Sequence, residues 1–195
     1  MARATEREPA EQEVRVQSGT VTLDGTLSPP APDAEGIILF AHGSGSSRFS
    51  PRNRAVAWTL QGARFGTLLL DLLTPEEEEV DLVTRQFRFD IGLLADRLIG
   101  AIDWLGRQPE TASFPIGLFG ASTGAAAALI AAAERPRAVH AVVSRGGRPD
   151  LARPYLSRVY APVLLIVGSL DTQVIGLNEE ALRELHEVKE LSLVP

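Results

Sequence analysis

The chain has 195 residues, 45% of them hydrophobic and 23% charged, which is the composition of a globular protein with a single core. Its formal net charge of −6 argues against nucleic-acid binding, because phosphate recognition depends on clustered lysines and arginines. The absence of cysteine excludes disulfides, thiolate metal sites and a cysteine nucleophile. We expect one domain over residues 12–195, preceded by a flexible tail at residues 1–11.

No membrane or export signal is expected. The first residues are charged and contain no apolar stretch of the kind that a secretory signal needs. The longest uncharged run, residues 117–133, is rich in glycine and alanine and is shorter than the about 20 residues of a membrane span. Together with the lack of cysteine, these features predict a cytoplasmic protein without membrane contact.

The order of elements begins with a hairpin. Residues 14–16 and 21–23 alternate apolar and polar side chains around Ser18-Gly19, which predicts an antiparallel pair at a sheet edge. From residue 36 onward the apolar runs lose this alternation, which is typical of strands covered on both faces. Such strands are predicted at residues 36–41, 67–71, 114–119, 138–143, 162–167 and 190–194.

Helices are predicted between these strands. They span residues 52–62 and 90–105, a stretch that follows the strand at residues 114–119 and ends near residue 135, and residues 178–188. Asn178 is the expected cap of the last of these helices, and a further short helix is expected to start near residue 150. Residues 72–88, which contain four consecutive glutamates, are expected to be a solvated surface without a chemical role. The alternation of strands and helices predicts a mostly parallel sheet with helices on both faces. No cap insertion separates residues 138–143 from 162–167, which favours an open, shallow site.

Residues 117–125 carry the strongest functional signal. An apolar strand ends in Gly120-Ala121-Ser122-Thr123-Gly124, and an alanine-rich run follows. In a G-x-S-x-G elbow between strand and helix, the serine has a strained backbone at the carboxyl edge of the sheet, and the glycines let the two elements approach closely. This pattern predicts that Ser122 is a nucleophile, with a purely structural turn as the alternative.

The order of these parts resembles the α/β-hydrolase family, in its small branch of dienelactone-hydrolase-like proteins without a cap domain. The resemblance covers residues 12–195 and rests on His42-Gly43-Ser44-Gly45, the elbow at Ser122, and Gly168-Ser169-Leu170-Asp171. It implies that Ser122 is the nucleophile, that Asp171 is the acid of a catalytic triad, and that His42 shapes the oxyanion loop. For Asp171 the alternative is a helix cap.

A serine nucleophile needs a base within hydrogen-bond reach and donors for the developing oxyanion. The backbone N–H groups of Thr123 and of Gly43 or Ser44 are expected to form that oxyanion hole. Arg145, among glycines at a strand end, is a candidate contact for an anionic group of the substrate, although arginines of this kind are more commonly solvated.

The catalytic histidine departs from the family pattern. In the family it follows the last strand, and the predicted last strand here is residues 190–194, so the chain would be truncated at that point. The histidines present are His42, His140 and His186. His140 is expected inside a buried strand in a structural role, and His186 on a helix surface. His42 is nearest to the predicted nucleophile. It is either the base of the reaction or a residue that only shapes the site.

Three hypotheses follow. The chain is a weak esterase with broad specificity for small, short-chain carboxylic esters, using Ser122 with an improvised base such as His42 or water. Alternatively, the histidine comes from residues outside this sequence or from a neighbouring chain in a homo-oligomer, or the protein is a non-catalytic binding module. Lactone or phosphoester hydrolysis is a further enzymatic alternative, and no cofactor or metal is expected.

Overall fold

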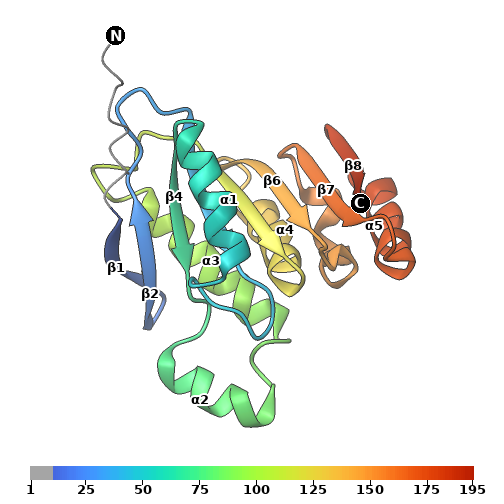
Figure 1. Ribbon diagram of the computed structural model, residues 1–195, viewed down its shortest axis with the longest axis horizontal. Helices are drawn as coiled ribbons and strands as arrows, with labels where there is room; N and C mark the ends of the chain where they lie inside the picture. Colours follow the sequence, from blue (N-terminus) through green and yellow to red (C-terminus); the bar gives the residue numbers. More distant parts are fainter. Residues whose placement is uncertain (1–10) are drawn as a thin grey trace.

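The computed structural model describes residues 11–195; the tail predicted for residues 1–11 lies, except for its last residue, outside the described part. Eight strands form one sheet in the order β1-β2-β4-β3-β5-β6-β7-β8 (Figure 1). The strands are β1 Gln12–Ser18, β2 Val21–Ser28, β3 Gly36–Ala41, β4 Phe65–Leu70, β5 Ile116–Ala121, β6 Val139–Arg145, β7 Val163–Gly168 and β8 Lys189–Val194. The helices are α1 Pro51–Gly62, α2 Pro75–Thr84, α3 Ile91–Leu105, α4 Thr123–Glu134 and α5 Thr172–Glu184, with a 3₁₀ segment η1 at Pro149–Arg158.

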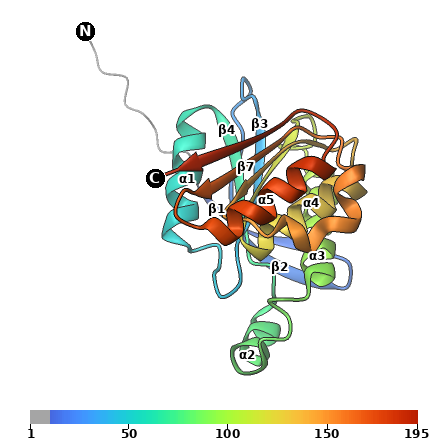
Figure 2. The same ribbon diagram turned by 90° about the vertical axis from the view of Figure 1, so that its right-hand side faces the viewer.

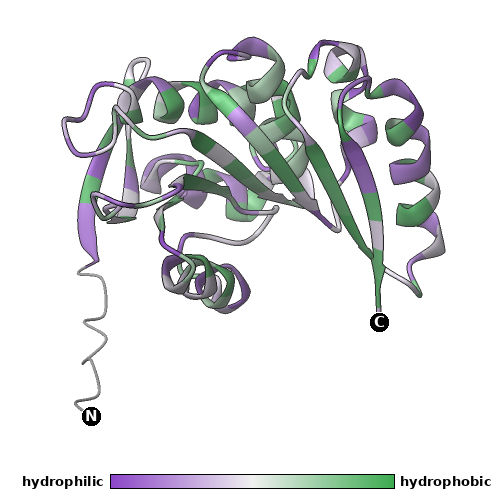
Figure 3. Ribbon diagram, turned by 90° about the horizontal axis from the view of Figure 1, so that it is seen from above, coloured by the Kyte–Doolittle hydropathy of each residue, from purple (hydrophilic) through white to green (hydrophobic). Residues whose placement is uncertain are grey.

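The strands of the sheet run in mixed directions, as predicted. β1 and β2 form an antiparallel hairpin at one edge, and β2 is also antiparallel to β4. All pairs from β4 to β8 are parallel. In Figure 3 the strands in the middle of the sheet are largely green, whereas β1 beside the N-terminal trace is largely purple. This difference follows from burial, because the inner strands have helices on both faces.

Different helices cover the two faces of the sheet (Figure 2), and each face has its own hydrophobic core. α1 covers one face, where Phe40, Leu69 and Phe119 pack against Ala57 of the helix. α3, α4, η1 and α5 cover the other face and enclose a larger cluster that includes Leu39, the neighbour of Phe40. Successive residues of a strand point to opposite faces, so an apolar run in β3, β4 and β5 supplies both cores. Residues 117–133 lie within these layers as β5 and α4, and none of the described helices is both long and apolar enough to span a membrane.

The segment after β4 differs from the prediction. Residues 75–84 form helix α2, which projects from the body of the molecule (Figure 1). Its start is a capping box, in which the Thr74 side chain accepts the Glu77 N–H and the Glu77 carboxylate accepts the Thr74 N–H. Glu77 also accepts a hydrogen bond from Arg97 of α3 at 2.6 Å. The expectation of a purely solvated acidic run is therefore wrong for Glu77.

The last helix begins earlier than predicted. α5 starts at Thr172, and the carboxylate of Asp171 caps it by accepting the Val174 N–H at 3.2 Å. Asn178 is fully buried inside this helix, and its amide donates to the carbonyl of Gly147 at 3.1 Å. The prediction was wrong because Gly176 lowers the helix propensity of the first turns, and because asparagine is a common cap.

Candidate active site

Ser122 lies at the turn from β5 into α4 with φ 50° and ψ −121°. A residue other than glycine persists in this region only where its surroundings hold it, at about 1–3 kcal/mol of strain. Here the Ser122 N–H donates to the Arg145 carbonyl at 3.4 Å, and the Ser122 carbonyl accepts from the N–H groups of Ala125 and Arg148 at 3.1 and 3.2 Å. The hydroxyl forms no capping bond to α4, so it is free to face the cleft beside it.

The glycines of the elbow allow three elements to meet. A Cβ atom on Gly124 would lie 2.4 Å from the carbonyl oxygens of both Ala41, the last residue of β3, and His42. A Cβ atom on Gly120 would lie 2.4 Å from the Cα of Ala125 in α4. Real Cβ atoms do not come this close to backbone, so only glycine permits this packing. The motif is thus explained by sterics at both glycine positions.

The loop after β3 lies directly against the elbow. A Cβ atom on Gly43 would be 3.0 Å from the Cβ of Ser122, which brings the backbone of Gly43 next to the serine. Gly43, Ser44, Ser122 and Arg145 line one cleft of about 660 Å³ at the carboxyl edge of the sheet. Val194 and Pro195, at the end of β8, line the same cleft. Four of the predicted site residues therefore come together here.

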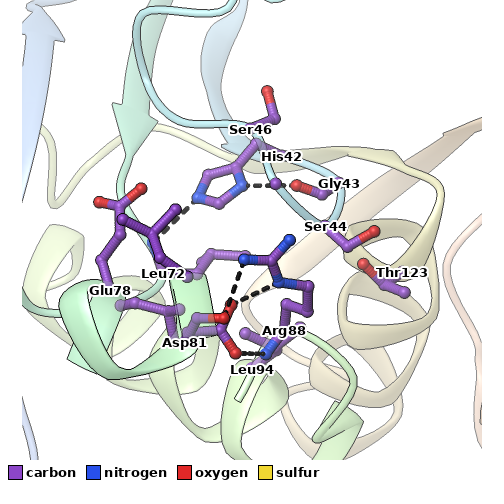
Figure 4. A pocket seen from close by; sticks show the side chains of 13 residues that line it. His42, Gly43, Ser44, Ser46, Leu72, Glu78, Asp81, Arg88, Leu94 and Thr123 are labelled. Carbon is purple, nitrogen blue, oxygen red and sulfur yellow. Dashed lines mark hydrogen bonds and ion pairs between the residues drawn. The ribbon is translucent and has the colours of Figure 1, made fainter. Parts of the chain in front are cut away.

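His42 is held in one neutral form. Its Nε2 accepts the Leu72 N–H at 3.1 Å, so the proton of the ring is on Nδ1, which contacts the Gly43 carbonyl at 2.9 Å (Figure 4). Burial lowers the pKa of His42, and it outweighs the opposite effects of the Gly43 hydrogen bond and the charge of Asp71. With both ring nitrogens engaged, the geometry favours the site-shaping alternative for His42 over its use as a base.

This burial predicts a pH dependence of stability. Unfolded His42 has a pKa near 6.5, so below about pH 6.5 the unfolded chain takes up a proton that the folded chain refuses. The stabilisation is thus complete above this pH and is lost as the pH falls toward the lower pKa of the folded state. We expect the thermal midpoint of the wild type to fall between pH 7 and pH 5, and that of His42→Gln to fall less. Circular dichroism melts measure both slopes, and parallel slopes would contradict the neutral, buried ring.

A second, smaller cavity lies beside the loop after β3 (Figure 4). Its volume is about 160 Å³, and its apolar walls include Leu72, Leu73, Leu82 and Leu94. Thr123 lines it as well; this side chain is 4% exposed, and its Oγ1 has no hydrogen-bond partner among the described residues. The loop residues Gly43, Ser44 and Ser46 line both the cavity and the cleft, so the two spaces adjoin at this loop.

An ion pair between Asp81 of α2 and Arg88, which follows this helix, lines one side of the cavity. The buried carboxylate of Asp81 accepts the N–H groups of Phe87 and Arg88 at 2.8 and 3.0 Å and also binds the Arg88 side chain. Burial alone would raise the pKa of Asp81, but these hydrogen bonds outweigh it and lower the pKa. A Cβ atom on Gly45 would lie 3.3 Å from Nη1 of Arg88, so the arginine packs against the loop after β3. The sequence interpretation missed this cavity because it missed α2, although the Thr74-x-x-Glu77 pattern after Leu73 was a signal for that helix.

Arg145 ends β6 and reaches across the cleft toward α1. Its Nη2 donates to Oδ1 of Asn53 at 2.9 Å, and its guanidinium lies 5.6 Å from the centroid of the Phe119 ring. Burial lowers the pKa of Arg145, and repulsion by the charge of Arg52 lowers it further by a smaller amount. The side chain is half-buried and lies in the Ser122 cleft, which is where a substrate contact was predicted.

The remaining predicted residues lie outside the cleft. Asp171 is exposed and caps α5, although Gly168 at the end of the same strand lines the cleft. His140 is exposed near the amino end of β6, so its predicted burial is wrong; the residues around it line an open hollow at that edge of the sheet. His186, between α5 and β8, is exposed at the same edge. Both histidines are therefore separated from Ser122 by the length of the strands. Within residues 11–195, no three acidic or histidine side chains gather as a metal site.

No protein-family model matches the chain. Two Mycobacterium tuberculosis proteins, from strains CDC 1551 and H37Rv, are 55% identical to it over 185 residues and carry the name phosphoribosyl transferase. The match covers 95% of this chain but 41% of theirs, so the chain spans less than half the length of these curated relatives.

Solved structures give a more complete match. A dienelactone hydrolase from Anabaena variabilis is 60% identical, with a TM-score of 0.94, and the alignment covers 97% of this chain and 87% of that one. Est1E from Butyrivibrio proteoclasticus, at 14% identity and a TM-score of 0.77 over 94% of this chain and 88% of its own, shares the fold. Both match the architecture of a mostly parallel sheet between helices. The chain therefore belongs to the dienelactone hydrolase family and has the α/β-hydrolase fold.

Proposed function

We propose that the chain is a serine hydrolase in which the Ser122 hydroxyl attacks small, short-chain carboxylic esters and forms an acyl-enzyme. The observation that carries this proposal is the strained Ser122 backbone, at φ 50°, beside an open cleft. Strain of this kind is characteristic of functional sites and of the nucleophile elbow in particular. The absence of a capping bond from the hydroxyl to α4 also supports the role of a nucleophile.

In the proposed reaction, Oγ of Ser122 forms a bond to the ester carbon while the carbonyl π electrons move onto the oxygen. The N–H groups of Thr123 and of Gly43 or Ser44 are the donors for that oxyanion. Thr123 is the first residue of α4, where the helix dipole adds positive potential. A base takes the proton of Oγ during this attack; collapse of the intermediate then expels the alcohol oxygen, which takes up that proton. Water next adds to the acyl carbon, the carboxylic acid leaves, and Oγ of Ser122 regains a proton.

The proposed acid is Asp171, in the loop after β7, and the proton acceptor is the least defined part of the site. Both nitrogens of His42 are in hydrogen bonds, which disfavours it. We propose that a histidine reaches the cleft past Val194 and Pro195, from residues that follow them or from a second copy of the chain, because both residues line the cleft. Without it, Ser122 would serve mainly activated esters, whose leaving groups need no proton.

The size of the apolar cavity supports a short acyl chain. Its 160 Å³ is close to the about 150 Å³ of an apolar protein cavity that binds benzene. We expect acetyl and butyryl groups to bind in this space, between Leu72 and Leu94, better than an octanoyl chain. Because a lactone is an internal ester, the same site would also open small lactones, and the name of the Anabaena variabilis structure favours this second candidate.

The phosphoribosyl transferase activity named for the Mycobacterium tuberculosis relatives is not part of the proposed function. That name refers to proteins of which the chain matches 41%, and the matching part has a hydrolase fold with a serine elbow. The proposed activity is therefore ester hydrolysis.

A fluorophosphonate probe tests the nucleophile directly. The serine oxygen attacks phosphorus and fluoride leaves, so a reactive serine gains one covalent phosphonyl group. We expect the intact mass to rise by a single probe and the modified peptide to contain Ser122. Prior incubation with a butyrate ester should slow the labelling. An unmodified protein, or a label on an exposed serine such as Ser169, would refute the proposal.

A further inference from the structure

Arg145 differs from the other arginines that are not exposed. Each of these pairs with a carboxylate: Arg48 with Asp71 and Glu13, Arg88 with Asp81, Arg97 with Glu77, Arg135 with Asp103, and Arg148 with Asp150. Within residues 11–195, Arg145 forms no ion pair, and its Nη2 donates to the neutral amide oxygen of Asn53. A partly buried cation is ordinarily paired, and acidic side chains outnumber basic ones in this chain. The positive charge of Arg145 is thus left for another partner.

A second arginine faces the same cleft. Arg52, in the first turn of α1, lines the cleft and likewise forms no ion pair within the described residues. The first turn of α1 contains no acidic residue, so its positive dipole end adds to the charge of Arg52. Repulsion between Arg52 and Arg145 contributes to the lowered pKa of Arg145, after the larger effect of burial. An anion in the cleft would relieve all of these unfavourable contacts.

We propose that Arg145 and Arg52 form a subsite for a phosphate group of the substrate, beside Ser122. The proposal rests on the proposed ester hydrolysis and names the substrate class for it. A phosphate monoester carries a charge of about −1.5 to −2 at pH 7, which balances two guanidinium groups, whereas a carboxylate would leave one uncompensated. The hydroxyl groups of Ser46 and Ser50 line the same cleft and can donate to the remaining phosphate oxygens.

The two spaces around the oxyanion loop then receive the two halves of the substrate. The apolar cavity takes the short acyl group, and the arginine cleft takes an alcohol part that carries the phosphate. Gly43 and Ser44, which line both, lie where the ester bond joins the halves. Hydrolysis adds one water across that bond and yields a short carboxylate and a phosphorylated alcohol, with the phosphate ester left intact.

Isothermal titration with inorganic phosphate tests this subsite without any need for turnover. We expect saturable binding to the wild type and to Ser122→Ala, and binding weaker by at least about tenfold in Arg145→Gln, as expected for a lost charge-assisted contact. Arg52→Gln, at an exposed position that does not threaten folding, should also bind more weakly. Arg148→Gln removes a neighbouring arginine that is already paired with Asp150 and should bind like the wild type. Thermal melts check that each variant is folded.

Acetate, titrated at the same ionic strength, separates phosphate from carboxylate recognition. Binding of acetate as tight as that of phosphate would overturn the phosphate assignment. Equal phosphate binding by the wild type, Arg145→Gln and Arg52→Gln, or no binding by the wild type, would overturn the subsite itself. Phosphate binding by a protein that hydrolyses no ester would refute only the proposed hydrolysis.

Discussion

The Ser122→Ala variant is expected to hydrolyse p-nitrophenyl acetate and butyrate at least about tenfold more slowly than the wild type, because it cannot form the acyl-enzyme. Substrate binding and the oxyanion donors do not depend on the hydroxyl, so the variant should keep the acceleration over buffer of about 10³-fold that they provide in serine hydrolases without their nucleophile. The substitution should not disturb the fold, because the Ser122 hydroxyl makes no capping bond and the turn is held through its backbone. Initial rates of the two proteins at equal concentration provide the measurement, and Ser169→Ala, at an exposed serine, is the matched control.

Added imidazole extends this comparison to the proton acceptor of the proposed reaction. The cleft beside Ser122 is open and wide, and imidazole is small enough to enter it and act as the base. We expect the rate of the wild type to rise with imidazole concentration well above that of Ser122→Ala, which reports the reaction of imidazole with the ester in solution. Parallel responses of the two proteins would mean that Ser122 is not activated by a base and would count against the acyl-enzyme.

The elbow could be predicted from sequence because its determinants are local. Gly120, Ser122 and Gly124 lie within five residues between an apolar strand and an alanine-rich helix, and their sterics depend on just these two elements and β3. The parallel sheet followed from apolar runs in the same way. By contrast, the state of His42 depends on the N–H of Leu72, thirty residues away, which no local pattern indicates.

The environment of Arg145 likewise depends on contacts between elements that are distant in the sequence. Its position at the end of a strand was predictable, but a missing counter-ion becomes visible only when every neighbouring element is in place. α2 shows the opposite case, because its capping box of Thr74 and Glu77 was present in the sequence and was outweighed by the run of glutamates. For Asp171, the sequence supports both a catalytic acid and a helix cap, and its capping bond to Val174 is a contact that either role permits.

The second large effect is expected from Gly124→Ala, which should unfold at a markedly lower temperature than the wild type. The new Cβ atom would lie 2.4 Å from the carbonyl oxygens of Ala41 and His42, and these backbone atoms cannot move without separating α4 from β3. Overpacking of this kind costs about 3 kcal/mol, which corresponds to a fall of about 6–12 °C in Tm for a chain of this length. The same shift should displace Ser122 and abolish fluorophosphonate labelling at temperatures where the variant is still folded.

Gly176→Ala provides the matched control for this substitution. Gly176 lies inside α5, and no heavy atom outside the helix is within 4 Å of an added Cβ, so alanine meets no steric obstacle there. Alanine is also the better helix former by about 1 kcal/mol, so this variant should melt slightly above the wild type and label normally. Opposite shifts of Tm in the two variants, measured by circular dichroism, would show that the spacing between β3 and α4 is what requires glycine at the elbow. Equal Tm values for Gly124→Ala and the wild type would contradict that close approach, and with it the steric explanation of the motif that holds Ser122 in its strained turn.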